Sequence, residues 1–520
     1  MKKPKYPIGV QTFSKLIEEG YTYIDKTDFI GKLVEKGGYF FLSRPRRFGK
    51  SLLLSTIHAF FDGRRELFKG LAIDRMNLDW TSSPVIHLDL NPENYTREDA
   101  LESLLSSYLL RYEKKYGCAG NNKSIPQRFQ DLIFAAYGET KQKVVILVDE
   151  YDKPLLGLEE DSDLFEKNQA LLKAFFGNLK TMDEYIRFAL LTGVARFSKV
   201  SIFSDLNNLN DISLSEKFAD ICGWTERELT DNFKPGIEEL AVKRQESFDT
   251  TVNALRKFYD GYMFANGGSR LYNPFSVMLA LYHSEIEPYW FETGTPTFLA
   301  RRIREKGVDA ALINGVTRSR EELVSVAIGA DDVIPLMFQT GYLTIASYDS
   351  RRLRYELRFP NREVEIGFAK NLLPLYAPKT QNPDGPFGIY SFQDDLDEGR
   401  PEDFIKRLAT LIKDIPYEMH DESVYQSIAY LVCLLSGTEP RAEQHSYRGR
   451  SDLEVHTQDY IYIFEFKFNG SAEEAIAQIR NRDYAGRYAF DPRGIYIIGA
   501  NFSDRKPERG LDAYIIEKIK

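Results

Sequence analysis

A Gly-Lys-Ser triplet at residues 49–51 has the residue types and the spacing to hold a phosphate group. It follows the apolar run 39–42 and opens into a helix-like stretch at 52–54. In this order of strand, loop and helix, the main-chain N–H groups of the loop point at the phosphate. The Lys50 amine then reaches the β- and γ-phosphates of a nucleotide, and the Ser51 hydroxyl can ligate Mg²⁺.

The loop before this triplet departs from the usual phosphate-binding pattern. That pattern places a glycine five residues before Gly49, whereas this sequence has Arg44 there, so the loop must turn in another way. Arg46, Arg47 and Phe48 complete the loop and are candidates, with Gly49, for contacts with the phosphates. Taken alone, the triplet also fits a helix N-terminus that carries Ser and Lys for capping and solubility.

An apolar run that ends in two acids lies roughly a hundred residues further along the chain. The run 144–148 is followed by Asp149 and Glu150. In such a pattern the first carboxylate holds Mg²⁺ through water and the second polarises the attacking water. A strand end whose acids cap the next helix is the alternative. The two motifs in this order, each at the C-terminal end of a buried strand, favour nucleotide binding.

A third apolar run, 187–192, ends at Thr192 and Gly193, with Arg196 close behind. If this strand lies between the other two in a parallel sheet, Thr192 would sense the γ-phosphate and Arg196 would stabilise the charge that develops on it. A turn from strand to loop with a solvated arginine explains the same residues at least as well.

Two acids and a lysine form a second candidate site near the C-terminus. Asp452 lies in the stretch 449–455, and the apolar run 460–468 carries Glu465 and Lys467. On a strand, Glu465 and Lys467 project from the same face. With Asp452 beside Glu465 on the adjacent strand, two carboxylates and a main-chain carbonyl can bind Mg²⁺, and Lys467 can orient or deprotonate a water. Such a site can hydrolyse a phosphodiester.

The alternative for this segment is an edge strand that carries Glu and Lys to block aggregation. Asp452 at hairpin distance, Gln478 on the helix-like stretch 472–488 and a return strand at 494–499 favour the catalytic interpretation. Glu422, on the helix-like stretch before the hairpin, could add a further acid near the metal, although an exposed Glu on a helix is ordinary.

The elements that must position these residues show distinct hydrophobic patterns. Continuous apolar runs separated by helical stretches predict a parallel sheet between helices, and hence an α/β fold, over residues 39–193. Residues 216–375 mix helical stretches with strand-like pieces at 342–347 and 354–359. The breaker-rich stretch 374–388 predicts a boundary. Beyond it we expect helices at 402–413, 421–435 and 472–486, and strands at 451–456, 460–468 and 494–499.

Composition limits the class of protein. The 520 residues carry 68 Lys and Arg against 77 Asp and Glu, a net charge of −9, and 43% of them are hydrophobic. This excludes a disordered chain and argues against a uniformly basic nucleic-acid binder. Three widely spaced cysteines predict neither a disulfide framework nor a Cys-ligated zinc site. Without an apolar N-terminal signal or a membrane-length apolar run, we expect a soluble, cytoplasmic protein with no membrane partner.

These residues resemble the bacterial AAA-ATPase-like family, whose members are commonly fused to a C-terminal PD-(D/E)xK nuclease-like domain. The phrases that resemble the ATPase are Tyr23-Ile24-Asp25-Lys26-Thr27, Phe41-Leu42-Ser43-Arg44-Pro45-Arg46-Arg47-Phe48-Gly49-Lys50-Ser51 and Thr192-Gly193-Val194-Ala195-Arg196-Phe197. Those that resemble the fused domain are Gly449-Arg450-Ser451-Asp452, Phe464-Glu465-Phe466-Lys467 and Gln478-Ile479. The resemblance covers nearly the whole chain and explains Arg44, because the family itself looks to use this arginine-rich loop. Ser451 replaces the Pro of the PD element, at a position that varies in the superfamily.

The resemblance implies three domains: an additional-strand P-loop ATPase core, a helical or winged-helix-like middle and a restriction-endonuclease-like domain. We place their boundaries at 1–215, 216–385 and 386–520. It also implies ATP and Mg²⁺ as cofactors. Ser51 and Asp149 are then the expected Mg²⁺ ligands of the ATPase, and Asp452 and Glu465 those of the nuclease.

The leading hypothesis is an enzyme in which ATP binding or hydrolysis controls a Mg²⁺-dependent nuclease, with DNA as the expected substrate. Foreign-DNA defence and mobile-element maintenance are settings that such an enzyme would fit. One alternative is a nucleotide-regulated switch whose nuclease-like domain binds nucleic acid or a protein without cutting. Another treats the C-terminal domain as an assembly module that makes the ATPase a homo-oligomer.

Overall fold

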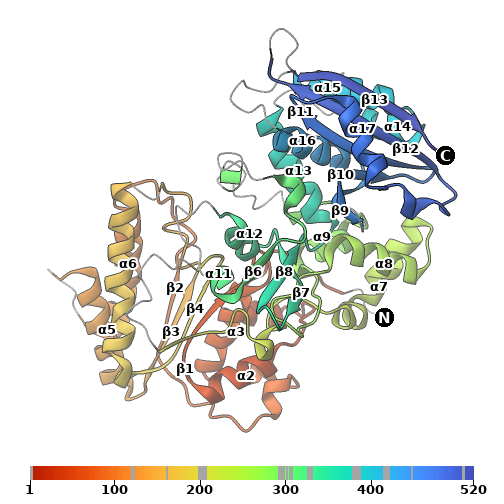
Figure 1. Ribbon diagram of the computed structural model, residues 1–520. Helices are drawn as coiled ribbons and strands as arrows, with labels where there is room; N and C mark the ends of the chain where they lie inside the picture. Colours follow the sequence, from red (N-terminus) through yellow and green to blue (C-terminus); the bar gives the residue numbers. More distant parts are fainter. Residues whose placement is uncertain are drawn as a thin grey trace. The chain divides into compact units, whose positions relative to one another are not determined.

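The computed structural model describes residues 4–118, 123–159, 162–196, 208–290, 299, 302–303, 309–324, 332–377, 388–413, 422–446, 449–505 and 510–520 (Figure 1). The chain divides into two compact units. The first unit comprises Met1–Gly294 and Thr317–Glu363, and the second comprises Thr295–Val316 and Val364–Lys520. The predicted middle region, 216–385, therefore contributes residues to both units. Most of the predicted boundary stretch 374–388, and Phe197 of the third ATPase-like phrase, lie outside the described ranges.

A five-stranded parallel sheet forms the centre of the first unit, in the order β2-β3-β4-β1-β5. Its strands are β1 (Gly38–Ser43), β2 (Val85–Asp89), β3 (Val144–Asp149), β4 (Ile186–Gly193) and β5 (Leu209–Asp211). β3 is buried along its whole length, which is why its apolar residues are continuous rather than alternating. The predicted parallel α/β sheet is confirmed, and β4 lies between β1 and β3 as the additional strand.

The strands of this sheet end in register at one edge. Ser43 at the end of β1 pairs with Gly193 at the end of β4, and Asp89 at the end of β2 pairs with Asp149 at the end of β3. Because all of these strands are parallel, the loops that follow them emerge side by side. The sheet thus brings the Gly-Lys-Ser loop, the acidic pair and Thr192 to one place.

Helices and a small sheet surround this core. The helices of the first unit are α1 (Phe13–Glu18), α2 (Thr27–Lys36), α3 (Lys50–Phe61), α4 (Ala100–Lys115), α5 (Ile125–Thr140), α6 (Asp163–Thr181), α7 (Glu226–Arg244), α8 (Phe248–Tyr259), α9 (Pro274–His283), α11 (Arg320–Val324) and α12 (Ile334–Thr340). An apolar cluster that includes Leu229, Phe233, Leu255 and Leu281 joins α7, α8 and α9. The predicted strand-like pieces form β7 (Thr344–Asp349) and β8 (Arg354–Arg358), which make an antiparallel sheet with β6 (Thr317–Ser319).

The second unit is built on a five-stranded mixed sheet in the order β13-β12-β11-β10-β9. Its strands are β9 (Glu439–Ser446), β10 (Gly449–His456), β11 (Tyr460–Phe468), β12 (Gly494–Ser503) and β13 (Gly510–Lys518). β11 and β12 are parallel, whereas the other neighbours are antiparallel. The helices are α13 (Arg362–Tyr376), which begins at the boundary of the first unit, α14 (Ile389–Asp397), α15 (Pro401–Ile412), α16 (Glu422–Leu435) and α17 (Ala472–Asn481).

Helix α17 connects the parallel strands β11 and β12 and packs closely against them. Its residues Ile476 and Ile479 join Ile463 and Ile497 of the sheet in an apolar cluster. Gly499 of β12 allows this close approach, because a Cβ atom there would lie 2.7 Å from the carbonyl oxygen of Ala472. The helix ends at Asn481, earlier than predicted, since Asp483 adopts a left-handed conformation with φ of 53°.

No helix within the described ranges combines the length and the apolar character needed to cross a bilayer.

Candidate functional site

The loop between β1 and α3 makes its turn with two left-handed residues. Arg47 has φ of 69° and Gly49 has φ of 93°, and α3 begins immediately afterwards at Lys50. The left-handed conformations of Arg47 and Gly49 explain how the loop turns with Arg44, and not a glycine, at the earlier position. The N-terminal end of α3 therefore adjoins the loop. The main-chain N–H groups of the first turn of α3, which have no partner inside the helix, favour an anion at this position.

Arg44 fixes this loop to a later part of the chain. The side chain is 1% exposed, and its guanidinium donates to the carbonyl oxygens of Ser213, Phe218 and Ala219 at 2.9 to 3.2 Å. It also lies 4.2 Å from the ring centre of Phe264. Burial lowers the pKa of Arg44 to about 10, which leaves it cationic at neutral pH. Arg44 is therefore a structural anchor of the loop.

Lys50 is held in the loop by three oxygen atoms. Its Nζ donates to the carbonyl oxygens of Arg44 at 3.0 Å and Pro45 at 3.3 Å, and it lies 3.4 Å from Oε1 of Glu150. The charges of Lys50 and Arg46 hold the pKa of the Glu150 carboxyl below its usual value despite its burial. Glu150 itself has a left-handed backbone, with φ of 51°. The predicted lysine and second acid thus face one another.

Asp149 is positioned by hydroxyl groups from the two neighbouring motifs. Thr192 Oγ1 donates to Asp149 Oδ1 at 2.6 Å, and the Ser51 side chain also hydrogen-bonds to this carboxylate. Burial and the charge of Glu150 nevertheless raise the pKa of Asp149. A carboxylate oxygen and a hydroxyl oxygen held in contact are the protein ligands that Mg²⁺ takes beside nucleotide phosphates. Ser51 and Asp149 therefore fit the ion.

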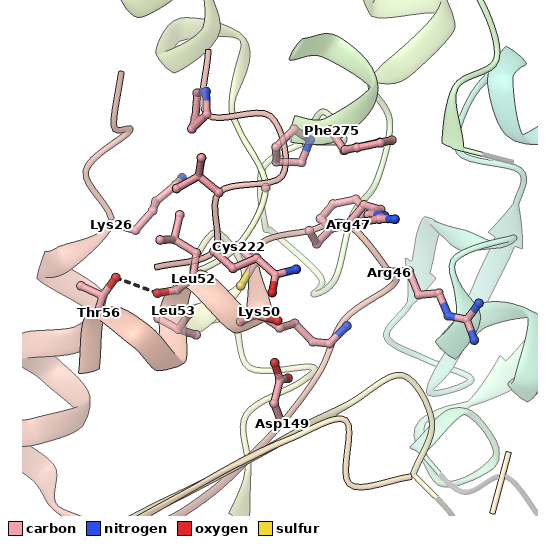
Figure 2. Close-up of a pocket in the computed structure, with 18 of the residues that line it drawn as sticks. Lys26, Arg46, Arg47, Lys50, Leu52, Leu53, Thr56, Asp149, Cys222 and Phe275 are labelled. Atoms are coloured by element: carbon pink, nitrogen blue, oxygen red, sulfur yellow. Dashed lines mark hydrogen bonds between the residues drawn. The ribbon is translucent and has the colours of Figure 1, made fainter. Parts of the chain in front are cut away.

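These residues line a cavity of about 400 Å³, large enough for a nucleotide. The predicted residues that line it are Arg46, Arg47, Phe48, Gly49, Lys50, Ser51, Asp149 and Glu150. Figure 2 shows Asp149 on one side of Lys50, with Arg47 and Phe275 on the other. The guanidinium of Arg47 lies 4.7 Å from the Phe275 ring centre. The part of the cavity wall near Arg47 is therefore partly aromatic.

The structure does not bring Arg196 to this cavity. Its Nη1 lies 2.5 Å from Oδ2 of Asp211, and its main-chain N–H donates to Oε1 of Gln339 at 2.7 Å. Thr192 also does not line the cavity, although its hydroxyl contacts Asp149. The predicted role of Arg196 in charge stabilisation stays a prediction.

Sequence reasoning missed three charged residues that line the cavity, Lys26, Asp89 and Lys153, and the buried acid Asp152, which does not line it. Lys26 lines it and forms an ion pair with Glu228 of α7 at 2.7 Å. Asp152 is buried, and its Oδ2 accepts the main-chain N–H groups of Val194 and Ala195, which fixes the turn after β4. Burial raises the pKa of Asp152 to about 7. Lys26 lies in a phrase noted for its resemblance, and Asp152 lies two residues after Glu150, so both had a sequence signal.

In the second unit the structure gathers the predicted C-terminal residues on one face of the sheet. Asp452 Oδ2 of β10 accepts the main-chain N–H of Phe466 at 2.7 Å, which places it beside β11. Lys467 Nζ donates to Glu465 Oε1 at 3.0 Å. Gln478 of α17 donates to the same oxygen through its side-chain amide. Asp452, Glu465, Lys467 and Gln478 thus form one cluster.

Glu465 is the buried centre of this cluster. It is 1% exposed, and its Oε2 has no hydrogen-bond partner within the described part of the chain. Burial first, and then the charge of Asp452, raise the pKa of Glu465 to about 7, although Lys467 opposes the shift. A buried carboxylate oxygen without a partner, next to a second carboxylate, fits a divalent cation.

The cluster contains two acids. Among the described residues, no group of three or more His, Cys, Asp and Glu side chains is arranged to hold a metal. Mg²⁺ accepts one or two carboxylates and completes its shell with water and substrate oxygens, so two acids remain sufficient. The side chain of Glu422, a candidate for a third acid, lies outside the described part of the structure.

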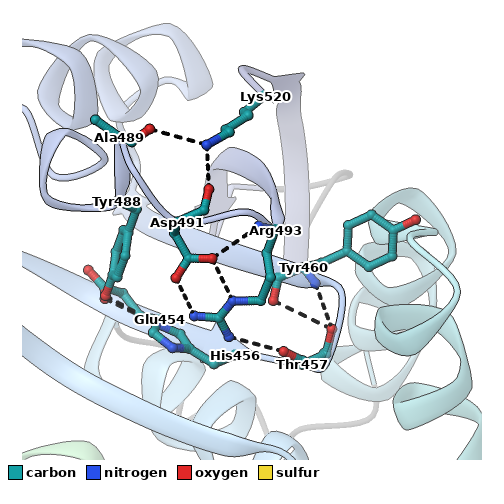
Figure 3. A network of polar contacts seen from close by, with 9 residues as sticks. All are labelled: Glu454, His456, Thr457, Tyr460, Tyr488, Ala489, Asp491, Arg493 and Lys520. Atoms are coloured by element: carbon teal, nitrogen blue, oxygen red, sulfur yellow. Dashed lines mark hydrogen bonds and ion pairs between the residues drawn. The ribbon is translucent and has the colours of Figure 1, made fainter.

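A further buried acid, Glu454, lies two residues beyond Asp452 but has other partners. Tyr488 donates to its Oε2 at 2.6 Å, and Arg487 pairs with its Oε1. Figure 3 shows this network continuing through His456, whose Nε2 lies 3.1 Å from the Tyr488 hydroxyl. Because both oxygens of Glu454 are used, it braces the segment after α17 against β10 and is not available to a cation.

Comparison with known proteins agrees with this geometry. A family model described as a predicted AAA-ATPase matches residues 7–203, and a model of the PD-(D/E)XK nuclease superfamily matches residues 420–510. A protein of Azotobacter chroococcum mcd 1, described as "Uncharacterized protein in vnfD 5'region", is 34% identical over 537 residues that cover 100% of both chains. The predicted resemblance is confirmed, and the chain belongs to the family of predicted AAA-ATPases that carry a C-terminal domain of the PD-(D/E)XK nuclease superfamily.

Proposed function

We propose that the first unit binds and hydrolyses ATP and that the second is a Mg²⁺-dependent nuclease, with DNA as its substrate, whose cleavage responds to ATP. The environment of the Glu465 carboxylate is the observation that carries this proposal. This carboxylate is buried beside Asp452, and one of its oxygens has no described partner. Burying such a group costs stability, and a strand that only blocks aggregation would have no use for it.

In the ATP site, each side chain supports a separate role. Lys50 exchanges its contacts with Glu150 and the loop carbonyls for the β- and γ-phosphate oxygens. Ser51 and Asp149 hold Mg²⁺, which when bound neutralises charge on the phosphates. Thr192 keeps Asp149 in place through its hydroxyl. Release from Lys50 leaves the Glu150 carboxylate to orient the attacking water.

The remaining loop residues contact the nucleotide around this centre. Arg46 and Arg47 line the cavity and supply positive charge, while Phe48 and Gly49 supply main-chain N–H groups. Arg196 is held by Asp211 in the present conformation. A direct role for it in hydrolysis requires that this ion pair opens.

In the nuclease site, Asp452 and Glu465 hold Mg²⁺, which when bound polarises the scissile phosphate. Lys467, anchored on Glu465, orients a water for attack on the phosphorus. Gln478 donates to the same Glu465 oxygen and so helps to hold the carboxylate that would bind the cation. α17 thereby sets the geometry of a site whose acids come from the sheet.

Cleavage of labelled single- and double-stranded DNA tests the proposal directly. The full-length protein is assayed with Mg²⁺, with and without ATP, beside the Asp452→Ala and Lys50→Ala variants. We expect Asp452→Ala to abolish cleavage while ATP hydrolysis continues, and Lys50→Ala to abolish ATP binding and the ATP response of cleavage. Asp459→Ala, which changes an acid outside the cluster, is the control.

A second candidate function is a nucleotide-regulated switch that binds nucleic acid without cutting it. Among the described residues, the cluster around Glu465 contains only two acids, Asp452 and Glu465, which favours this alternative. DNA binding that weakens steeply with salt, without a Mg²⁺-dependent product on any substrate, would support it and overturn the nuclease proposal. ATP hydrolysis in the same preparation shows that the protein tested is folded.

A further inference from the structure

Trp290 contacts the main chain of the phosphate-binding loop without lining the nucleotide cavity. Its indole Nε1–H donates to the carbonyl oxygen of Arg46 at 3.2 Å. Trp290 is buried and is not among the residues that line the nucleotide cavity, whereas Arg46 is. The hydrogen bond therefore reaches the cavity through the main chain of the loop. A change in the orientation of the Arg46 peptide would break or strengthen it.

Gly341 packs against Pro45, the residue that precedes Arg46 in the loop. It has φ of 91°, and a Cβ atom there would lie 2.6 Å from Cβ and Cγ of Pro45. The same point would lie 3.6 Å from the Trp290 ring. Pro45 and Arg46 are thus held against two residues that come from much later in the chain. This contact leaves little room for the loop to move without moving Trp290.

Glu363 holds Trp290 at its main chain. The Trp290 N–H donates to Glu363 Oε1 at 2.9 Å, and Glu363 is fully buried. A buried hydrogen bond to a carboxyl group is costly to leave unmade, so the two residues shift together. The P-loop is therefore connected to Glu363 by two hydrogen bonds in series, through Trp290.

Both residues stand where the chain passes between its two units. The chain leaves the first unit after Gly294 and again after Glu363, and it returns at Thr317. Trp290 precedes the first of these exits closely, and Glu363 is the residue of the second. Helix α13, which begins at Arg362, continues from there into the second unit.

We propose that the hydrogen bonds of Trp290 to the Arg46 carbonyl and to Glu363 transmit nucleotide occupancy from the P-loop to the segments that lead into the second unit. The inference rests on the proposed function, since it requires a nucleotide beside Lys50. Phosphate oxygens draw on the loop N–H groups and reorient the Arg46 peptide. The indole follows the Arg46 carbonyl, and Glu363 follows the Trp290 main chain.

Fluorine NMR of the full-length protein labelled with 5-fluorotryptophan tests the first step. The chain has three tryptophans, and the Trp290→Phe variant identifies the Trp290 resonance. We expect Mg²⁺ with a non-hydrolysable ATP analogue to shift that resonance. Trp80 does not line the cavity, and its ring centre lies 4.5 Å from that of Phe60. It is the internal control, and its resonance should not shift.

Hydrogen exchange of α13 tests the second step. We expect the analogue to change exchange in peptides from 364–377 by about threefold or more in the wild type and in Glu363→Gln, which keeps an acceptor for the Trp290 N–H. Trp290→Phe keeps the ring but loses the indole donor, so it should bind the analogue with at most a roughly threefold loss while the change in α13 disappears. Glu363→Ala should behave in the same way as Trp290→Phe.

The outcomes separate the inference from the function on which it rests. A wild type that binds no ATP overturns both. A wild type that binds the analogue with an unmoved Trp290 resonance overturns the inference alone. A Trp290→Phe variant that retains the full response of α13 also overturns it, whereas selective loss of that response with binding preserved supports it.

Discussion

At the scale of single residues, Arg44 is where this phosphate-binding loop differs most from a glycine-rich one. Its buried guanidinium donates to three carbonyl oxygens of the segment 213–219 and lies over Phe264. Lysine cannot reproduce this planar fork of donors. We expect Arg44→Lys to lower the free energy of unfolding by about 2 to 4 kcal/mol, measured in urea. Arg97→Lys, at an exposed position, is the matched control, and equal stabilities would contradict the anchor role.

A second residue-scale prediction concerns pH. Burial raises the pKa of Glu363 from 4.5 to about 8, and Tyr259 and Tyr262 are the titratable groups that sense its charge. Between these two pH values the folded protein binds a proton that the unfolded chain lacks. Stability therefore falls as pH rises through this window, by at most about 1.4 kcal/mol per pH unit from this group.

Glu363→Gln removes this contribution. We expect urea unfolding at pH 5.5 and pH 7.5 to show a smaller loss of stability in the variant than in the wild type. The difference between the two proteins isolates Glu363 from the other groups that titrate in the same range. Parallel stability curves for the two proteins would show that Glu363 is ionised in the folded state at neutral pH.

Residue types and spacing predicted which residues come together at the two candidate sites, but not how those residues are held. Lys50, Ser51 and Asp149 could be predicted because each follows a recognisable apolar run. The partners of Arg44 could not, since its contacts are with carbonyls up to 175 positions away, and main-chain groups leave no mark in a sequence. Similarly, nothing in the sequence indicated that one oxygen of Glu465 would be buried without a partner.

At the scale of elements, the approach of α17 to β12 depends on Gly499. A methyl group at this position would meet the Ala472 carbonyl oxygen at 2.7 Å and Cβ of Ala475 at 2.9 Å. Gly499→Ala should push the helix outward, moving Gln478 away from Glu465, and cost about 1 to 3 kcal/mol of stability. We expect Mg²⁺-dependent cleavage to fall while ATP hydrolysis is retained.

Gly138→Ala is the control for that variant. Gly138 lies within α5, and a Cβ atom there would have no neighbour within 4 Å, so alanine should raise stability by about 0.5 to 1 kcal/mol. Cleavage that is unchanged in Gly499→Ala would show that the contact between α17 and β12 does not set the geometry of the nuclease site.

Elements were predictable where their hydrophobic pattern was strong. β3 is a continuous apolar run, and its position followed from that run alone. β9 reads Glu-Pro-Arg-Ala-Glu-Gln-His-Ser, which has neither apolar continuity nor alternation, so its pairing with β10 could not be predicted. Tertiary pairing decided the conformation of this segment, against its own propensity.

At the scale of the whole molecule, nucleotide binding should appear as thermal stabilisation. A ligand at a hundred times its Kd adds about 2.7 kcal/mol to the stability of the state that binds it. We expect Mg²⁺ with ATP to raise the Tm of the wild type and to leave that of Lys50→Ala unchanged, measured by calorimetry. Lys69→Ala, which removes an exposed lysine outside the cavity, should keep the response, and its loss there would point to a general charge effect.

The alternation of the chain between its units also bears on how the protein is made. The first unit takes its last segment from Thr317–Glu363, after the excursion Thr295–Val316. On the ribosome, the first unit is therefore complete only once residue 363 has been made, although the last strand of its central sheet, β5, ends at Asp211. The second unit includes Asp309, whose carboxylate accepts the Ser427 hydroxyl at 2.8 Å. A gene fragment that starts at residue 420, where the nuclease sequence match begins, would omit this part, and any continuous segment that contains the whole of one unit also contains residues of the other.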